Sequence, residues 1–385
     1  MEGRKVRFAA FFVPLPSFPP DSLIQSRFPI FTSMMTEQLI SLTDFWALRE
    51  NLPIVDARSE GEFAQSHTPR AINLPILNDA ERVVVGTLYK EKGAEAATIK
   101  GFELVGPRFH QIQKEALTLF PEKKILLYCW RGGMRSQILS WLLGMVGFEV
   151  YRLKGGYKTY RTFTFAEVRK ERKLLVLGGK TGVGKTILLK KLREKGEQVL
   201  DLECIANHKG SSFGSIGLPP QPTVEQFENL MAEQLMRFDP ALPVWVENES
   251  RRIGRIILPD LFYALILKSH LIDIQKSDEE RVVHIAEEYG NLPSEELIAA
   301  VNRLKKKLGG LRTQEAIEAI LAGDHQAWIS NLLLYYDKTY EFDLARHEEG
   351  STVALDLGDK SIEDQLALLL KIKNQHDTKS TYQAH

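Results

Sequence analysis

The 385-residue sequence has very little cysteine, no long apolar segment and no net charge. Its two cysteines, Cys129 and Cys204, are too few for a disulfide framework and are typical of a reducing compartment, which predicts a cytoplasmic protein. No uninterrupted apolar run approaches the roughly 20 residues that a membrane-spanning helix needs, so no membrane segment is expected. Since 50 basic residues balance 50 acidic ones, a site for a polyanion has to come from local clustering.

The length exceeds that of one ordinary core and predicts two domains. Short apolar runs alternate with helical patterns over residues 37–160 and again over 173–375, which indicates two parallel α/β domains, the second mostly helical toward its end. The basic stretch 161–172 is predicted to link them. Residues 1–34, with a basic start and several prolines, are interpreted as a disordered extension or an upstream start. The predicted strands are LPIVDAR, AINLPIL and KKILLYCW in the first domain and KLLVLGG, QVLDLE, PVWVENES and LIDIQKS in the second.

A glycine-rich turn follows the first strand of the second domain. The stretch GKTGVGKT, residues 179–186, satisfies G-x-x-x-x-G-K-[ST], and the strand before it and the helix after it are the context that this phosphate loop requires. Its backbone N–H groups and the helix N-terminus favour phosphate, and its lysine reaches outer phosphates. The ligand stays open between ATP, GTP and another diphosphate. The predicted phosphate-binding residues are Gly179, Gly182, Gly184, Lys185 and Thr186, of which Thr186 would ligate Mg²⁺ beside a bound nucleotide.

Acidic residues follow two other strands of this domain. Glu247 and Glu249 lie in VWVENES, and Asp201 and Glu203 follow QVLDLE. They are candidate metal ligands, or solvated residues at strand ends.

The cysteine Cys129 ends a buried strand and begins the loop CWRGGMRS ahead of a helix. Backbone N–H groups that converge on the sulfur, together with nearby guanidinium groups, favour the thiolate, so Cys129 is predicted to be a nucleophile for an anionic donor. The spacing C-x5-R is one residue longer than in most sulfurtransferases and equals that of phosphatases, which favours a phosphorus-centred oxyanion. The predicted oxyanion loop is Arg131, Gly132, Gly133, Arg135 and Ser136, supported by Asp56 and Arg58; Cys204 is interpreted as structural.

Several motifs together resemble a known family. IVDARSEGEF, AINLPIL and the Cys129 loop resemble a rhodanese domain. Its position ahead of a phosphate loop, with VGTLYKEKG, LKGGYKTYR, DLECIANHKGSSFG, VWVENESRRIG and YYDKTY, resembles the bacterial tRNA 2-selenouridine synthases over about residues 37–345. The resemblance implies a rhodanese-like parallel-sheet domain followed by a P-loop NTPase-like α/β domain with a mostly helical C-terminal part.

The resemblance also implies an activity. Members convert wobble 2-thiouridine of Lys, Glu and Gln tRNAs to 2-selenouridine through S-geranyl-2-thiouridine, using geranyl diphosphate and selenophosphate, the latter from a supplying enzyme. The family's essential cysteine matches Cys129, and its phosphate loop matches 179–186. We hypothesise that the Cys129 thiolate attacks selenium and releases phosphate. Lys185 and Thr186 would hold the diphosphate, with a regulatory nucleotide as the alternative.

Two basic clusters are candidate tRNA contacts. Arg251, Arg252 and Arg255 lie in ESRRIGR, beside a predicted strand end, and a second run spans Arg303 to Lys307. Phosphate binding by such clusters depends strongly on salt. The alternative for the second run is a solvated helix face.

Two other functions fit the same motifs. One is a rhodanese-type sulfurtransferase or phosphatase fused to an NTPase without an RNA substrate, although Tyr128 stands where phosphatases of this loop length carry histidine. The other is an oxyanion sensor switched by nucleotide, which requires an inert Cys129.

Overall fold

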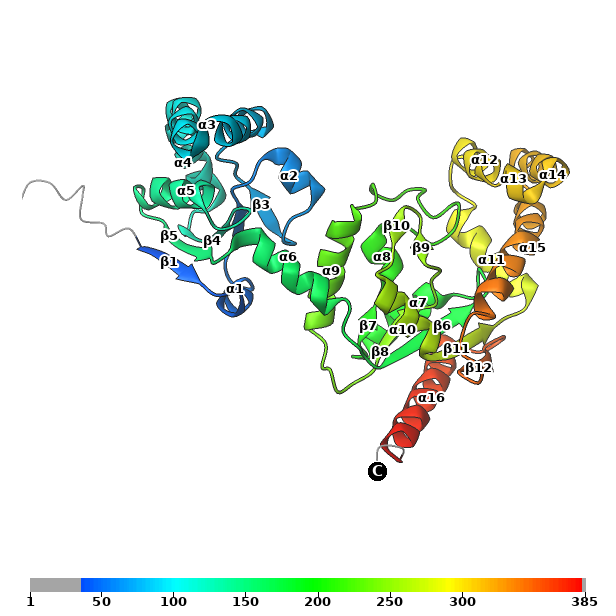
Figure 1. The fold of residues 1–385 in the computed structure, drawn as a ribbon. Helices are drawn as coiled ribbons and strands as arrows, with labels where there is room; N and C mark the ends of the chain where they lie inside the picture. Colours follow the sequence, from blue (N-terminus) through cyan, green and yellow to red (C-terminus); the bar gives the residue numbers. More distant parts are fainter. Residues whose placement is uncertain (1–35, 383–385) are drawn as a thin grey trace, which may run out of the picture.

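Two parallel β-sheets, one after the other along the chain, organise the computed structural model, which describes residues 36–382 (Figure 1). The first sheet has the strand order β1-β5-β4-β2-β3 and the second the order β12-β11-β6-β8-β7. This arrangement confirms the predicted fold class of two successive α/β domains. The interpretation of residues 1–34 lies outside the described residues.

The first domain surrounds its sheet with helices, so the central strands are buried and read as continuous apolar runs. Strand β2 pairs with β4 so that Asp56 lies opposite Tyr128, and this register brings the ends of both strands together. The strands are β1 (Thr36–Ile40), β2 (Ile54–Asp56), β3 (Ala71–Asn73), β4 (Lys124–Tyr128) and β5 (Glu149–Leu153). The helices are α1 (Leu42–Leu48), α2 (Glu60–Gln65), α3 (Asp79–Val105), α4 (Phe109–Leu119), α5 (Met134–Gly144) and α6 (Gly156–Glu167), with the 3-10 turn η2 (Gly106–Arg108).

The second domain begins with a buried strand and ends in a helical region. Its sheet is formed by β6 (Leu174–Gly179), β7 (Val199–Leu200), β8 (Val244–Glu247), β11 (His270–Gln275) and β12 (Thr352–Asp356), with a separate hairpin of β9 (Arg252–Ile253) and β10 (Ile256–Ile257). The helices are α7 (Lys185–Glu194), α8 (Leu202–Ala206), α9 (Val224–Met236), α10 (Asp260–Lys268), α11 (Asp278–Tyr289), α12 (Ser294–Arg303), α13 (Lys305–Leu308), α14 (Gly310–Leu321), α15 (His325–Leu344) and α16 (Ile362–Tyr382). No helix within residues 36–382 is long and apolar enough to cross a membrane.

Several helix starts are specified locally. In a capping box the side chain of the residue before the helix accepts a hydrogen bond from the backbone N–H of the third helical residue. The side chain of that third residue in turn accepts one from the backbone N–H of the residue before the helix. This reciprocal pair fixes where each helix begins. The pairs are Ser41 with Asp44 (α1), Ser59 with Glu62 (α2), Asn78 with Glu81 (α3) and Ser277 with Glu280 (α11).

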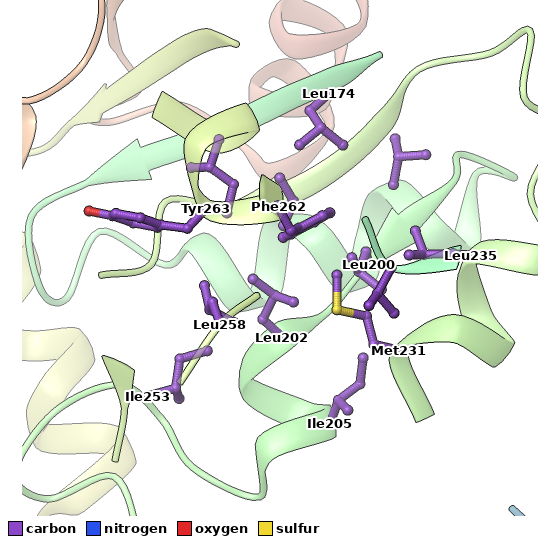
Figure 2. Close-up of a cluster of buried hydrophobic side chains, with 14 of the residues drawn as sticks. Leu174, Leu200, Leu202, Ile205, Met231, Leu235, Ile253, Leu258, Phe262 and Tyr263 are labelled. Carbon is purple, nitrogen blue, oxygen red and sulfur yellow. The ribbon is translucent and has the colours of Figure 1, made fainter. Parts of the chain in front are cut away.

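The second domain contains two separate apolar cores of interest. One lies between the sheet and helices α8 to α10, where Leu200, Met231 and Phe262 pack together (Figure 2). The other belongs to the helical region, where Leu297 and Trp328 are among the buried residues. The helical region therefore has an apolar core separate from the one that packs on the sheet.

Helix α9 of the second domain packs against α6 of the first through polar side chains (Figure 1). Asn229 is fully buried there; its side-chain amide donates to the Tyr157 hydroxyl at 2.8 Å, and its oxygen accepts from Thr164 at 2.9 Å. Glu228 pairs with Arg169 at 2.7 Å. Buried polar groups that all find partners favour one docking geometry, so the domains are held in a defined arrangement.

Candidate active sites

The cysteine loop joins β4 to α5 in the first domain. Cys129 is buried, and its sulfur lies 3.2 Å from the hydroxyl oxygen of Ser136 and 3.8 Å from the carbonyl oxygen of Gly133. The Ser136 hydroxyl also donates to that carbonyl at 3.0 Å. The sulfur therefore lies at the start of α5 beside the one hydroxyl that the sequence pattern assigned to this loop.

The start of α6 fixes the shape of the cysteine loop. The backbone N–H of Tyr157 donates to the carbonyl of Cys129 at 2.8 Å. A Cβ at Gly156 would lie 2.2 Å from that carbonyl oxygen and 2.5 Å from the nitrogen of Gly132, so no side chain fits there. Gly132 itself has a φ of 65°. The stretch LKGGYK, which sequence reasoning used only as a family marker, therefore has the physical role of clamping this loop.

The two predicted arginines of the loop have different surroundings. Arg131 is exposed, whereas Arg135 forms an ion pair with Glu62 of α2, with a closest approach of 2.5 Å. Burial alone would raise the pKa of Glu62, but the hydrogen bond and charge of Arg135 outweigh it and hold that pKa below its ordinary value. Glu62 was not predicted, and its partner lies 73 residues away, so local sequence gave no signal for the pair.

Asp56 and Arg58 form a buried ion pair at 2.7 Å next to the cysteine loop. Burial opposes the charge of Arg58, but the hydrogen bond and charge of Asp56 raise its pKa above the ordinary value. The guanidinium lies 4.0 Å from the ring centre of Tyr157 and donates to the carbonyl of Ser66 at 2.6 Å. The pair therefore supports the walls of the site.

A cavity of about 720 Å³ opens beside this loop. Basic side chains outnumber acidic ones on its walls, so an anion is favoured there. Trp130 lines it and is partly exposed, whereas its neighbour Cys129 is buried and is not among the lining residues. The basic lining residues are Arg58, Arg82, Lys90, Arg131 and Arg135, and the acidic ones are Glu62 and Glu225.

The phosphate loop has the expected strand–turn–helix form between β6 and α7. The ammonium group of Lys185 donates to the carbonyl of Gly179 at 2.6 Å, across the turn. Desolvation lowers the pKa of Lys185, although nearby carboxylates oppose the shift. Gly182 has a φ of 89°, and a Cβ there would lie 2.9 Å from the carbonyl oxygen of Arg281, so glycine is required.

The predicted acidic residues gather around the phosphate loop. The hydroxyl of Thr186 donates to Glu203 at 3.3 Å, and burial raises the pKa of Glu203, Glu247 and Glu249. Asp201 instead caps α8, accepting from the N–H of Cys204 at 2.9 Å. Within residues 36–382 no cluster of three or more histidine, cysteine or acidic residues could hold a metal ion.

A second cavity, of about 640 Å³, extends from the phosphate loop to the helical region. Lys185, Thr186, Glu203 and Glu249 line one end. The opposite end consists mainly of aromatic and aliphatic side chains, described below. The phosphate loop therefore faces a cavity large enough for a small molecule.

The predicted tRNA contacts lie on both sides of this cavity. Arg252 is exposed and lines it, Arg255 is exposed on the same hairpin, and Arg251 pairs with Asp260 at 2.6 Å. From the second basic run, Arg303 and Lys307 also line the cavity. The structure therefore brings members of both basic clusters to one cavity, while their role in binding tRNA stays a prediction.

Sequence reasoning missed His208, which lines the same cavity and is 8% exposed. A Cβ at Gly214 or Gly254 would lie less than 3 Å from its ring, so both glycines make room for the imidazole. Burial lowers its pKa, and its Nδ1 atom has no hydrogen-bond partner within the described part of the chain. The available signal was its place between the motifs DLEC and GSSFG.

Arg281 of α11, also missed, supports the phosphate loop from behind. It is 1% exposed, donates to the carbonyl of Thr181 at 2.8 Å and pairs with Asp337 of α15 at 2.5 Å. The pair joins the phosphate loop to the helical region.

Replacing Asp337 with asparagine should therefore lower the free energy of unfolding by about 2–3 kcal/mol, because the buried charge of Arg281 loses its main partner. The matched control is Glu341→Gln, one turn along α15, which removes an exposed pair with Lys180 at 3.4 Å and should cost less than about 0.5 kcal/mol. Urea denaturation followed by circular dichroism measures both. Equal losses for the two variants would contradict a supporting role for Arg281.

Two protein-family descriptions match the two domains of this chain. The family description "tRNA 2-selenouridine synthase AAA domain" matches residues 172–361, and "Rhodanese-like domain" matches residues 41–162. Among solved structures, the N-terminal domain of a candidate ATP/GTP binding protein from Clostridium difficile 630 is 39% identical to this chain. The match covers 33% of this chain and 98% of that domain, with a TM-score of 0.31.

Full-length relatives cover both domains. The tRNA 2-selenouridine synthase of Sulfurovum sp. (strain NBC37-1) is 36% identical over 348 residues, which is 81% of this chain and 94% of the relative. That of Nitrosomonas europaea is 34% identical over 360 residues, or 80% and 93% of the two chains. Because the similarity extends through the cysteine loop and the phosphate loop in one chain, the protein belongs to the tRNA 2-selenouridine synthase family of tRNA-modifying enzymes.

Proposed function

We propose that this enzyme replaces the sulfur of wobble 2-thiouridine by selenium in two steps, one at each cavity. The first step uses geranyl diphosphate at the phosphate loop, and the second uses selenophosphate at the Cys129 loop. The substrates are the Lys, Glu and Gln tRNAs. One observation carries the proposal: a single chain has two separate anion-favouring cavities, one beside a cysteine and one at a phosphate loop.

In the geranylation step, the sulfur of 2-thiouridine forms a bond to C1 of the geranyl group. The C1–O bond breaks, the electron pair leaves with diphosphate, and the uridine N3 loses its proton, for which we propose Glu249, which lines the same end of the cavity, as acceptor. The amides of the phosphate loop and the ammonium of Lys185 stabilise the charge on the leaving diphosphate.

Magnesium fits this step as an accessory. Thr186 and Glu203 offer the hard oxygen ligands that Mg²⁺ prefers, and their oxygens are 3.3 Å apart. Since two protein oxygens do not fill an octahedral shell, the diphosphate and water would supply the rest. Bound there, Mg²⁺ would neutralise charge on the diphosphate.

In the selenium step, electron balance decides which atom Cys129 attacks. Attack on selenium would leave the bonding pair on phosphorus, which yields a phosphite-level product and not phosphate. Attack on phosphorus balances: the S–P bond forms, the P–Se bond breaks, and hydrogenselenide leaves with the pair. We therefore replace the hypothesis of attack on selenium by attack on phosphorus, which also suits the C-x5-R spacing of Cys129 and Arg135.

Hydrogenselenide then completes the exchange. It adds to C2 of the geranylated base, the C2–S bond breaks, and geranylthiolate leaves and takes a proton from water. The proton on selenium moves to N3, which gives 2-selenouridine. Water hydrolyses the S-phosphocysteine to phosphate and restores Cys129.

The test follows the modified nucleoside by mass spectrometry after each addition to a tRNA that carries 2-thiouridine. Geranyl diphosphate alone should give S-geranyl-2-thiouridine, and later addition of selenophosphate should give 2-selenouridine with release of geranylthiol. Selenium incorporation at the full rate without geranyl diphosphate would overturn the two-step route.

A further inference from the structure

The cavity above the phosphate loop has two chemically different halves. The half at the loop contains Lys185, Thr186 and the carboxylates of Glu203 and Glu249. The other half is formed by the helical region and by the segment between α8 and α9. Its aromatic and aliphatic lining residues are Phe213, Tyr289, Leu304, Trp328, Ile329, Leu332, Leu333, Tyr335 and Tyr336.

Aromatic rings form a continuous wall in this second half. Phe213 stacks on Trp328 with ring centres 5.9 Å apart and meets Tyr289 edge-on at 6.1 Å. All three side chains are less than 10% exposed, so the rings are held in place by the core of the helical region.

The polar atoms of two rings in this wall, Trp328 and Tyr336, are already engaged within the protein. The indole N–H of Trp328 donates to Nδ1 of His325 at 3.3 Å. The hydroxyl of Tyr336 accepts from the backbone N–H of Ser212 at 3.2 Å. Ile329, Leu332 and Leu333 add only hydrocarbon. A branched hydrocarbon chain needs only apolar contact, which these rings and aliphatic side chains supply.

Helix α15 connects the two halves. Tyr340 hydrogen-bonds Asp273 of β11, beside the phosphate-loop strand, and Leu333 lies seven residues earlier on the same helix. Seven residues correspond to about 10 Å along an α-helix. This span is comparable with two extended isoprene units, so a chain anchored by its diphosphate at the loop would extend along α15 to Leu332 and Leu333.

We propose that the apolar half of this cavity is a subsite for the prenyl tail of the diphosphate substrate, and that Leu332 and Leu333 set the accepted chain length. The proposal rests on the proposed function, since it assumes that a prenyl diphosphate is the donor. It adds the recognition of the hydrocarbon and the residues that select it.

The experiment compares dimethylallyl, geranyl and farnesyl diphosphates as donors to tRNA that carries 2-thiouridine. Leu332→Ala removes hydrocarbon contact and opens space for a longer chain. The ratio of kcat/KM for geranyl diphosphate to kcat/KM for farnesyl diphosphate should therefore fall about tenfold. Leu333→Trp fills the subsite with a larger side chain. The ratio of kcat/KM for geranyl diphosphate to kcat/KM for dimethylallyl diphosphate should therefore fall at least about tenfold.

The matched control is Leu297→Ala. Leu297 is 2% exposed in the same helical core as Leu332 but does not line the cavity. It should lower thermal stability as Leu332→Ala does, while the donor preference stays at the wild-type ratio. An equal change of preference in the control, or no change in the two cavity variants, would overturn the subsite.

A second measurement needs no variant. Isothermal calorimetry on the wild-type protein measures the Kd of non-reactive geranyl thiodiphosphate and the Kd of inorganic diphosphate. Because the prenyl tail adds apolar contact, the Kd of geranyl thiodiphosphate should be at least about a hundredfold lower. Equal affinities would overturn the subsite even if geranylation proceeds. If wild-type enzyme transfers no prenyl group from any donor, the proposed function itself fails, which separates the two outcomes.

Discussion

Replacing Cys129 with serine should stop selenium incorporation while S-geranyl-2-thiouridine still forms at the wild-type rate. A serine hydroxyl stays protonated near neutral pH and is a far weaker nucleophile than a thiolate, so the selenium step should slow by at least about a thousandfold. The substitution nearly conserves volume, and the neighbouring Ser136 hydroxyl can still hydrogen-bond the new side chain. Nucleoside mass spectrometry of the tRNA measures both products in one sample.

The control for this prediction is Cys204→Ser, which changes the other, exposed cysteine and should leave both steps intact.

The covalent intermediate of the wild-type enzyme also distinguishes attack by Cys129 on phosphorus from attack on selenium. Phosphorus-32 from labelled selenophosphate should remain on the protein after treatment with a reducing thiol if phosphorus is attacked. Selenium-75 that is bound to the protein and released as selenide by that thiol would contradict attack on phosphorus. A serine enzyme that incorporates selenium normally would exclude Cys129 as the nucleophile.

Replacing Lys185 with alanine should lower the rate of geranylation about a hundredfold to a thousandfold. The reason is that a preorganised cation facing the leaving diphosphate is lost. Selenium exchange on tRNA that has been geranylated beforehand should continue, because that step belongs to the other cavity. The two steps are assayed separately with defined tRNA substrates.

Lys190→Ala is the matched control, since Lys190 is an exposed lysine on the same helix, α7. It changes the net charge equally and should leave both steps unaffected. Intact geranylation by the Lys185 variant would refute the diphosphate role of the loop. If geranylation of the wild type instead required added ATP or GTP, the regulatory nucleotide would be the better reading.

Local patterns in the sequence predict much of this protein, because strands, turns and helices depend on neighbouring residues. The loop at Cys129 and the phosphate loop at Lys185 lie where a strand–turn–helix pattern predicts them. The helical character of residues beyond Glu279 is also apparent, although strand β12 within that region was not predicted. Its short sequence pairs with β11 along one edge only and is mostly exposed, so it gives a weak apolar signal.

Contacts between distant segments were beyond such patterns. Glu62 pairs with Arg135, and Arg281 with Asp337 56 residues away, only because the folded chain brings separate helices together. Helix α6 includes part of the predicted linker 161–172, and it packs against α9 to form the contact between the domains. Periodicity identifies these helices, but it does not identify the partner that each polar side chain will meet.

Helix α9 has a consequence for how one tRNA passes through both reactions. Its first turn contributes Glu225 to the cysteine cavity, while Met231 is anchored in the second domain's core. The two cavities share no lining residue, so a single flipped-out nucleotide cannot occupy both. On the proposed route the anticodon must therefore withdraw from one opening before it enters the next. Between the two cavities, the geranylated tRNA can be displaced by other tRNA molecules. A chase with unlabelled geranylated tRNA would reveal whether it leaves the enzyme before the selenium step.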